Sequence, residues 1–544
     1  MTSLGHAISS PTRAPPLRPK RSSYLVAGLA SLAALSACHQ APDSGVGGIL
    51  RRGLGGEPST LDPAAAADTF STSLLLDLYE GLTAESPTGD VIPGVATSWT
   101  IDPTGTEYVF HLRSEARWSN GRQIKAQDFV AAWRHEVDAK TASPAADDLR
   151  LVAHATSILA GKERPEALGV FAPTDSTLVV KLEQPAAYFP QILAHPGTFP
   201  VYSDTMAKSH RPDQWVSNGA YVLADWQPNT TITLKANPHY WDRAHVYIGR
   251  VQYLFKPDDA AQYAGYRAGE IDVTDTVPVN ALPMLRKDHP AELVVSPFLA
   301  TAYYGINLAN KTLSPVALRQ ALAMAIDRKH LVESLGFGQV GAYGFVPLGT
   351  ANYTPQAWYW KDFSDAERIA TAKRLYAQAG FTATSPLHLR VLFNDNEVIR
   401  RTAIVIAEMW KETLGVEVQL TAEEYKVFLQ SRHDTSRWDV ARLAWNADFN
   451  DASNFLDVLR SHSPNNDMSY VNPKLDAYLD KAAATVDVAY RRKDLESAEQ
   501  LVLNDYPIIP LYFFVSKRLV KPYVHGFQSN PLNHLSSKSL ILER

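Results

Sequence analysis

Apolar and polar residues follow a regular order in one stretch of the second half of the chain. Over residues 387–393 every second residue is apolar, which is the pattern of a β-strand with one buried face. Over residues 397–414 apolar side chains recur at helical spacing, and Gly415 stands where a helix C-cap is expected. Residues 416–420 alternate again. This order predicts a right-handed βαβ unit in a largely parallel sheet.

A further helix is predicted just upstream of this unit. Ser364 is a suitable N-cap for a helix over residues 365–379, and Gly380 follows it. One face of this helix carries apolar side chains at helical spacing, so we expect that face to pack in a core.

Another strand is predicted over residues 438–443, and polar and aromatic residues follow it. In open α/β sheets ligands gather beyond the carboxyl ends of the strands, so Trp445 and Asp448 are candidate site residues. Asp448 also has a structural alternative, as a surface residue or the N-cap of a helix expected from about Ala452. Asp451 is the better placed cap for that helix, which leaves Asp448 less well explained by structure alone.

The N-terminal half has a different pattern, with short strands and few long helices. Tyr108, Phe110 and Leu112 alternate with polar or exposed positions, and a turn is predicted at residues 119–121. Further short strands are expected at residues 178–182, 221–223, 231–234 and 251–255. The fold class predicted for the whole chain is therefore α/β, with an α+β part in the N-terminal half.

The first residues resemble an export signal. A basic cluster at residues 18–21 precedes an apolar run over residues 24–37, which is too short to span a bilayer. The run ends in Leu35-Ser36-Ala37-Cys38, which looks like the lipid-attachment motif of bacterial lipoproteins, and Cys38 is the only cysteine of the chain. We expect a signal peptide at residues 1–37, an acylated Cys38 and a tether over residues 38–48. The alternative is an ordinary signal with a buried cysteine.

Composition and charge exclude several classes of protein. The 544 residues are enough for about three domains. Apolar residues make up 45% and charged residues 20%, which argues against a disordered or multi-pass membrane protein. Removing the first 37 residues, with four basic side chains and no acids, changes the formal charge from -5 to -9. A chain of that sign has no general attraction for nucleic acid or anionic lipid.

Sequence motifs of the common enzyme classes are absent. The chain has no Gly-x-Ser-x-Gly elbow, no His-Glu-x-x-His helix and no phosphate-binding glycine loop, and a single cysteine cannot form a thiolate metal site. The 16 histidines show no paired ligand spacing. We therefore expect neither an enzyme, nor a metal site, nor a cofactor. A catalytic triad assembled from distant residues remains the open alternative.

Several longer motifs resemble the family 5 extracellular solute-binding proteins, and together they span nearly all of the chain after the signal. They include Ala96-Thr97-Ser98-Trp99, Ala116-Arg117-Trp118-Ser119-Asn120-Gly121, Ser217-Asn218-Gly219-Ala220-Tyr221, Asn237-Pro238-His239-Tyr240-Trp241, Ala325-Ile326-Asp327-Arg328, Trp445-Asn446-Ala447-Asp448 and Arg518-Leu519-Val520-Lys521-Pro522. So many motifs in one order make the resemblance specific.

The resemblance implies two lobes joined by a hinge, with an additional domain inserted into the first. Domain I would comprise residues 49–79, 203–299 and 514–544, the inserted domain II residues 80–202, and domain III residues 300–513. Members of this family hold an extended peptide between the lobes by main-chain pairing and deliver it to the membrane subunits of an ABC permease. We accordingly expect a monomeric receptor for oligopeptides at the periplasmic side of the envelope. A receptor for murein peptide or another small solute is the alternative, and an envelope hydrolase is a more distant one.

The resemblance also implies roles for individual residues. Asp448 matches the aspartate that receives the peptide α-ammonium, Trp445 and Asn446 would flank the peptide backbone, and Tyr425, Tyr266 and Tyr303 would line the cleft. Arg442 and Arg432 match arginines that meet the peptide carboxylate, although a structural ion pair is an equal alternative for Arg432.

Some positions depart from the family pattern. A well-known member has a tyrosine where this chain has Ala145, a histidine at Ile399, a lysine near Ala323, and a cysteine pair at Ala300 and Asn446. The preferred peptide length therefore stays open. His39 after the lipid cysteine also leaves open which membrane would hold the anchor.

Overall fold

The computed structural model describes residues 48–66, 68–202, 212–382 and 384–544. The predicted signal peptide and Cys38 lie outside the described residues. Three sheets of four or more strands organise the rest of the chain. Each of them corresponds to a part of the sequence with its own hydrophobic pattern.

The first four-stranded sheet has the order β1-β10-β9-β8. Its strands are β1 (Ile49–Leu54), β10 (Arg250–Phe255), β9 (Thr231–Ala236) and β8 (Tyr221–Gln227). Strand β1 runs parallel to β10, and the other neighbours are antiparallel. The predicted strands in this region are confirmed, and the first of them continues to Gln227.

The second four-stranded sheet lies in the predicted insert and has the order β4-β5-β7-β6. Its strands are β4 (Ala96–Ile101), β5 (Glu107–Leu112), β7 (Thr177–Lys181) and β6 (Val170–Thr174). All neighbours are antiparallel. Tyr108 and Phe110 of β5 are fully buried, as the alternation predicts, and α2 (Ala126–Glu136) packs against β6 and β7.

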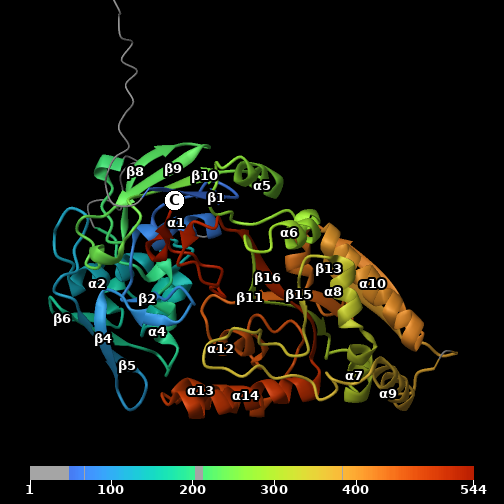
Figure 1. Ribbon diagram of the computed structural model, residues 1–544. Coiled ribbons are helices and arrows are strands. Elements are labelled where there is room, and N and C mark those ends of the chain that lie inside the picture. The colour runs from blue at the N-terminus through green and yellow to red at the C-terminus, as the bar shows by residue number, and fades with distance from the viewer. Residues whose placement is uncertain (1–47, 67, 203–211, 383) are drawn as a thin grey trace, which may run out of the picture. The chain divides into compact units, whose positions relative to one another are not determined.

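A six-stranded sheet organises most of the second half of the chain, and Figure 1 labels its strands β11, β13, β15 and β16. The strand order is β12-β16-β11-β15-β13-β14. Its strands are β12 (Val340–Gly341), β16 (Ile508–Leu519), β11 (Leu293–Ile306), β15 (Val440–Asn446), β13 (His388–Asn394) and β14 (Glu417–Glu423). β13 runs parallel to β14 and β15, and α10 (Glu397–Leu414) connects β13 to β14. The βαβ unit is confirmed. The sheet is nevertheless mixed rather than largely parallel, because β11, β12 and β16 pair antiparallel.

Capping residues in the sequence mark the ends of two helices in this half of the chain. Helix α9 (Asp365–Gln378) begins with a capping box between Ser364 and Glu367. Helix α10 ends at Gly415, whose φ of 77° is the left-handed conformation that glycine adopts without strain. The remaining helices are α1 (Thr69–Leu78), α3 (Ala155–Leu159), α4 (Phe189–Ile192), α5 (Asp259–Arg267), α6 (Leu282–Asp288), α7 (Val316–Ala325), α8 (Arg328–Leu335), α11 (Tyr425–Ser431), α12 (Ser453–Leu456), α13 (Pro473–Ala484) and α14 (Val488–Asp505).

The predicted insert does not have a hydrophobic core of its own. One continuous cluster of buried side chains includes Leu50 and Val251 of the first sheet, Phe110 and Trp133 of the insert, and Leu540 near the C-terminus. The segment after β16 therefore returns to the N-terminal part of the molecule. Two other clusters lie within residues 299–532 and cover the six-stranded sheet.

Strands β11 and β16 connect these two bodies of the chain. Their first pairs, from Leu293↔Leu519 to Pro297↔Val515, lie beside residues of the first lobe, where the backbone N–H of Thr274 donates to Leu519. After a register shift the pairing resumes at Thr301↔Phe513, inside the six-stranded sheet. The predicted boundaries between domains I and III, at residues 299/300 and 513/514, fall at this register shift. We therefore keep them as proposed domain boundaries.

Arg328 ties several elements of the third sheet together although it is almost fully buried. Its guanidinium donates to the carbonyl oxygens of Ala342 at 2.6 Å, Pro510 at 2.7 Å and Ala323 at 3.0 Å. Burial lowers the pKa of Arg328 to about 10, because the desolvated cation is disfavoured. The cation lies over three aromatic rings, those of Tyr343, Trp358 and Trp360.

We expect Arg328→Met to lower the free energy of unfolding by about 3 kcal/mol or more, because it leaves buried carbonyls without donors. Arg374→Met, on an exposed position of α9, is the matched control and should change stability by about 0.5 kcal/mol or less. Chemical denaturation of both variants measures the difference. Equal losses in the two variants would contradict the role assigned to Arg328.

Candidate functional site

The carboxyl ends of three parallel strands meet at one edge of the six-stranded sheet. β13 lies between β15 and β14, so the chain passes from β13 to one side and then returns to the other. Such a switch in direction leaves a crevice beside the central strand, and ligands of open α/β sheets bind there. Asn394, Glu423 and Asn446 end these strands, and Tyr425 follows at the exposed start of α11.

Asp448 is held at this edge by the crossing of β11. Ala300 pairs with Asn446 at the end of β15. The backbone N–H of Ala447 then donates to the carbonyl of Leu299 at 2.8 Å. Asp448 is therefore fixed next to the residues where β11 passes from one lobe to the other. Neither contact involves a side chain of the site, so the strand geometry alone sets this position.

A buried asparagine orients two of the predicted site residues. The amide Nδ2 of Asn454 donates to Oδ2 of Asp448 at 3.4 Å, and Nε1 of Trp445 donates to Oδ1 of Asn454 at 2.7 Å. Asn454 is 6% exposed, whereas Asp448 is exposed. Asn454 was not predicted from the sequence, because nothing in the local pattern indicates that its side chain turns back to residues 445 and 448.

Asp448 is not the N-cap of α12 in this structure. The N-cap of α12 is Ala452, and the carboxylate of the preceding Asp451 accepts from the backbone N–H of Ser453 at 2.9 Å and pairs with Arg491 at 2.6 Å. Within the described residues, Asp448 accepts a side-chain hydrogen bond from Asn454 and none from the backbone of α12. Its carboxylate is thus oriented but left open to a ligand.

Two charged residues of the insert act electrostatically on Asp448. Surrounding protein atoms raise the pKa of the Asp448 carboxyl above its ordinary value although the residue is exposed, because they replace part of the bulk water around it. The charge of His195 lowers this pKa and that of Asp148 raises it.

His195 and Asp148 form an ion pair in the insert. Nδ1 of His195 lies 2.5 Å from Oδ2 of Asp148, and both side chains are partly buried. Burial disfavours the imidazolium, but Asp148, followed by Asp448 and Glu85, outweighs it and raises the pKa of His195 to about 9. His195 is therefore a cation at neutral pH. The pair was missed in the sequence because 47 positions separate its members.

A buried glutamate lies behind this pair. Glu136 is 4% exposed, and its Oε1 accepts from the hydroxyl of Ser143 at 2.9 Å. Desolvation, with the charges of Asp148 and Asp62, raises the pKa of Glu136 to about 8, so it is protonated at neutral pH.

Backbone packing is tight around the pair. A Cβ at Gly197 would lie 2.3 Å from Oδ2 of Asp148 and 2.8 Å from Cβ of Ala145. Gly197 thus allows the segment after His195 to approach Asp148. Ala145, where a well-known family member has a tyrosine, is 7% exposed and lies against this segment.

The two predicted arginines have different surroundings. Nε of Arg432 lies 3.4 Å from Oδ2 of the buried Asp467, which is the structural ion pair left open in the sequence analysis. Arg442 on β15 is partly buried, and its guanidinium has no ion pair or hydrogen bond within the described part of the chain. Arg442 is therefore the more available of the two for a ligand carboxylate.

Two predicted cleft tyrosines are not on an accessible surface in this structure. Tyr303 is 2% exposed and packs edge to face with Phe345 in a core of the third sheet. Tyr266 is 3% exposed and lies in a small core of the first lobe. Its hydroxyl donates a hydrogen bond to the carboxylate of Glu292. Both face inward because their strand or helix positions belong to the apolar face. The structure brings together Asp448, Trp445 and Asn446, but not these two residues.

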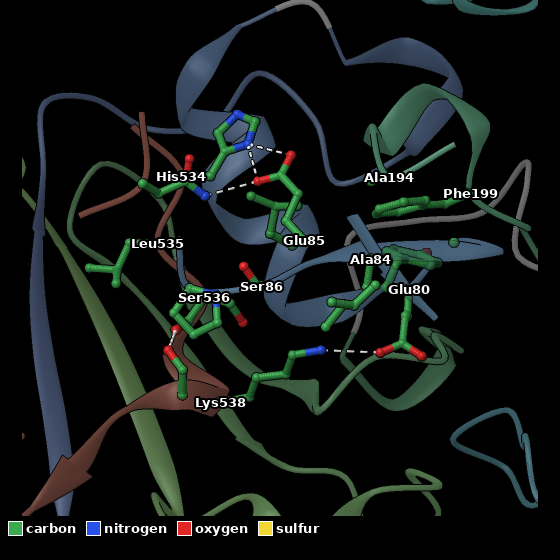
Figure 2. A pocket seen from close by; sticks show the side chains of 17 residues that line it. Glu80, Ala84, Glu85, Ser86, Ala194, Phe199, His534, Leu535, Ser536 and Lys538 are labelled. Atoms are coloured by element: carbon green, nitrogen blue, oxygen red, sulfur yellow. Dashed lines mark hydrogen bonds and ion pairs between the residues drawn. The ribbon is translucent and has the colours of Figure 1, made fainter. Parts of the chain in front are cut away.

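A separate pocket lies where the C-terminal segment meets the start of the insert (Figure 2). Four charged side chains line it, and they pair with one another: Lys538 with Glu80 at 3.2 Å and His534 with Glu85 at 2.9 Å. None of the predicted site residues lines this pocket.

The comparisons with known proteins match nearly the whole chain. The family model for bacterial extracellular solute-binding proteins, family 5 matches residues 90–467. The periplasmic oligopeptide-binding protein OppA of Escherichia coli (strain K12) is 37% identical over 504 residues, which are 91% of this chain and 92% of that protein. The chain belongs to the family 5 bacterial extracellular solute-binding proteins.

Solved structures agree with this assignment. The murein tripeptide binding protein MppA in its unliganded open form superposes with a TM-score of 0.86 at 35% identity, covering 91% of this chain and 97% of that one. OppA of Haemophilus influenzae in complex with RPPGFSPFR gives 0.69 at 33% identity, covering 91% and 98%. The two-lobed periplasmic-binding-protein fold predicted from the sequence is confirmed.

The described residues hold neither a candidate membrane span nor a candidate metal site. No helix there combines the length and the apolar character needed to cross a bilayer. No group of three or more histidine, cysteine, aspartate or glutamate side chains in that part of the chain is arranged to hold a metal ion.

The His195–Asp148 pair makes stability depend on pH. The folded-state pKa of His195, about 9, lies above the ordinary value of 6.5, so its stabilisation is fully present below about pH 6.5 and is lost as the pH rises through about 9. We expect the Tm advantage of the wild type over His195→Gln to shrink between these values in thermal scans. His245→Gln, at an exposed pair, is the control. A pH-independent difference between wild type and His195→Gln would contradict this assignment.

Proposed function

We propose that this protein is a receptor that captures oligopeptides between its lobes and delivers them to an ABC permease, with Asp448 receiving the peptide α-ammonium. One observation carries the proposal. Asp448 is an exposed carboxylate, oriented by Asn454 and fixed at the lobe crossing, in the crevice position of the sheet. The family assignment and the relatives named for oligopeptide binding support it.

The charges suit a free peptide amino terminus. A carboxylate and an α-amine with a pKa of about 7.7 to 8.0 carry opposite charges at neutral pH. Enclosing the amine without a partner would cost several kcal/mol, so a free terminus should be required. Exposed Asn446 and the indole of Trp445 lie beside Asp448 and are proposed to flank the first peptide units. Main-chain pairing of the rest of the peptide would make binding tolerant of sequence.

We propose that the other end of the ligand lies at Arg442, whose guanidinium has no ion pair among the described residues. A partly buried guanidinium without a carboxylate partner is a suitable site for the peptide C-terminus. Arg432 would contribute only if a ligand competed with Asp467. Tyr425 is exposed at the start of α11 and is proposed to contact the ligand side chains. Tyr303 and Tyr266 could do so only after a rearrangement that uncovers them.

Asp448→Asn should weaken binding of an unmodified tripeptide at least tenfold, because the neutral amide cannot balance the ammonium. N-acetylation of the peptide should weaken wild-type binding by a similar factor and add little in the variant. Isothermal titration measures both effects. Asp362→Asn, an exposed acid of the same lobe, is the control. Unchanged affinity in both tests would exclude the assigned role.

Murein peptide is the second candidate ligand, because a murein tripeptide binding protein superposes well on this chain. Oligopeptides and murein peptides can share a free amino terminus, so Asp448 does not separate them. Mass spectrometry of ligand that copurifies with the protein distinguishes the two. Linear peptides of varied sequence support the first candidate, and muropeptide fragments support the second.

The family consists of binding proteins, and we propose that this chain likewise has no catalytic activity. The alternative hypothesis, that the protein is an envelope hydrolase, can be tested directly. Peptides incubated with the purified protein and analysed by mass spectrometry should be recovered intact.

We further propose that the mature chain is anchored at the periplasmic side of the envelope through acylated Cys38. The support is the sequence motif alone, since Cys38 lies outside the described residues. More than one acyl chain on the mature N-terminus would make the attachment stable. The receptor would then bind ligand as a monomer at the membrane, without a cofactor.

Cys38→Ala should move the protein from the membrane fraction to the soluble envelope fraction, because the acylated residue is lost. Fractionation with immunoblotting, and incorporation of labelled palmitate, measure the change. Ser36→Ala, which keeps a small residue before the cysteine, is the control. Membrane association of Cys38→Ala equal to that of the wild type would contradict the anchor.

A further inference from the structure

The loop that follows Asp448 contacts the insert through two successive residues. The ring of Phe449 stacks on the ring of Tyr188, with centroids 5.1 Å apart and planes 3° from parallel. Nδ2 of the buried Asn450 donates to the carbonyl oxygen of Gly89 at 3.3 Å. Tyr188 and Gly89 belong to the insert, whereas the loop belongs to the lobe built on the six-stranded sheet, the second lobe. The loop is therefore an interlobe contact.

Arg491 of α14 anchors the next residue of this loop and also meets Tyr188. Its Nη1 donates to Oδ2 of Asp451 at 2.6 Å, and its Nη2 donates to Oδ1 at 2.7 Å. Such a two-point pair fixes the plane of the guanidinium. The guanidinium carbon lies 5.8 Å from the ring centroid of Tyr188, which is within cation–π distance. The second lobe thus contacts the ring of Tyr188 with both Phe449 and Arg491.

The contact buries apolar surface of both lobes. Tyr188 is 9% exposed and belongs to the core cluster shared by the first lobe and the insert. Phe449 comes from the second lobe, yet it packs against that same cluster. Beside the rings, the backbone N–H of Ala187 donates to the carbonyl oxygen of Ala483 in α13 at 3.2 Å. Separating the two rings would therefore expose apolar surface to water.

The lobes of this chain are arranged as in the open form of a relative. Two solved structures of MppA are each 35% identical to this chain and cover 91% of it. The unliganded open form superposes with a TM-score of 0.86, whereas the other structure, 98% of which is covered, gives 0.71. Because the sequence similarity is the same in both cases, the higher score reports how the lobes are placed. The stack of Tyr188 on Phe449 is therefore a contact of the open arrangement.

Closure of the lobes would disturb this contact. Stacked rings attract each other only over a narrow range of offset and tilt. The two rings belong to bodies that β11 and β16 connect, and hinge closure around a ligand rotates one such body against the other. Rings that are 3° from parallel in the open arrangement would then lose their alignment. Part of the binding free energy of a ligand would be spent on separating them.

We propose that Tyr188, Phe449 and Arg491 form a latch that stabilises the open arrangement and thereby lowers the affinity for peptide. This inference rests on the proposed function. The latch lies next to the candidate ligand acid, because Phe449 directly follows Asp448 in the chain. The apparent affinity of a receptor is reduced by the fraction of molecules in the binding-competent arrangement. Weakening the latch raises that fraction, so affinity should rise.

The test is isothermal titration of an unmodified tripeptide into the full mature chain carrying Tyr188→Leu or Phe449→Leu. Each substitution keeps an apolar side chain but removes the stack. We expect the Kd to fall about threefold to tenfold in both variants, the range expected for the loss of one aromatic pair. Tyr188→Phe keeps the stack and should bind as the wild type does. A contact that only supports folding would give unchanged or weaker binding, so the sign of the change decides.

Phe363→Leu is the matched control. Phe363 packs edge to face with Tyr359 at 5.7 Å on an exposed surface of the second lobe, and its loss should leave tripeptide affinity unchanged. Small-angle X-ray scattering of the ligand-free proteins is the second measurement. Both latch variants should have a smaller radius of gyration than the wild type and the control. Phe449 is only partly buried, so Phe449→Leu decides if Tyr188→Leu does not fold in thermal unfolding.

The outcomes separate this inference from the proposed function. Where the tripeptide binds, affinity decides: equal or weaker binding by both latch variants would overturn the latch and leave the receptor function standing. If the folded wild type binds no tripeptide, the receptor function fails and scattering decides the latch, which equal radii would overturn and more compact variants would support. Tighter binding by the latch variants, with Tyr188→Phe and Phe363→Leu equal to the wild type, supports both.

Discussion

The antiparallel pairing of β11 with β16 is the interaction on which the rest of this structure depends. The two strands pass from the first lobe into the six-stranded sheet, and their register shifts between Pro297 and Thr301. β15 pairs with β11 directly beyond that shift, which places Asn446 opposite Ala300 and ties Ala447 to Leu299. Backbone hydrogen bonds thus hold the candidate acid, Asp448, at the crossing between the lobes. A movement of one lobe relative to the other would change its surroundings at once.

The electrostatics of the site follow from this position. A carboxylate at the end of a strand would ordinarily be well hydrated, but surrounding protein atoms replace part of the water around Asp448 and raise its pKa. The same closeness lets Asp448 contribute to the high pKa of His195, which belongs to the insert. The pair of His195 with Asp148, rather than a tyrosine at position 145, is what this chain presents to Asp448.

Burial explains why the predicted site was only partly assembled. Tyr266 and Tyr303 belong to motifs that match the family, yet their side chains pack inside cores, Tyr266 against the ammonium of Lys521 and Tyr303 against Phe345. Arg432 and Arg442 look equivalent in the sequence, but only Arg432 has a buried aspartate within reach. A motif fixes the identity of a residue. Whether its side chain faces a ligand depends on which neighbours fill the space around it.

The sequence by itself determined the features that depend on neighbouring residues. The ends of α9 and α10, the βαβ unit and the alternation in β5 follow from caps and periodicities within about 20 residues. Long motifs determined the family and pointed to Asp448. Only the tertiary structure decided what surrounds that acid: the bridging amide of Asn454, the ion pair of His195 with Asp148, and the mixed order of the six-stranded sheet. The reason is physical: desolvation and charge interactions depend on distances in space, and pairing between residues 47 positions apart leaves no periodic signal in the chain.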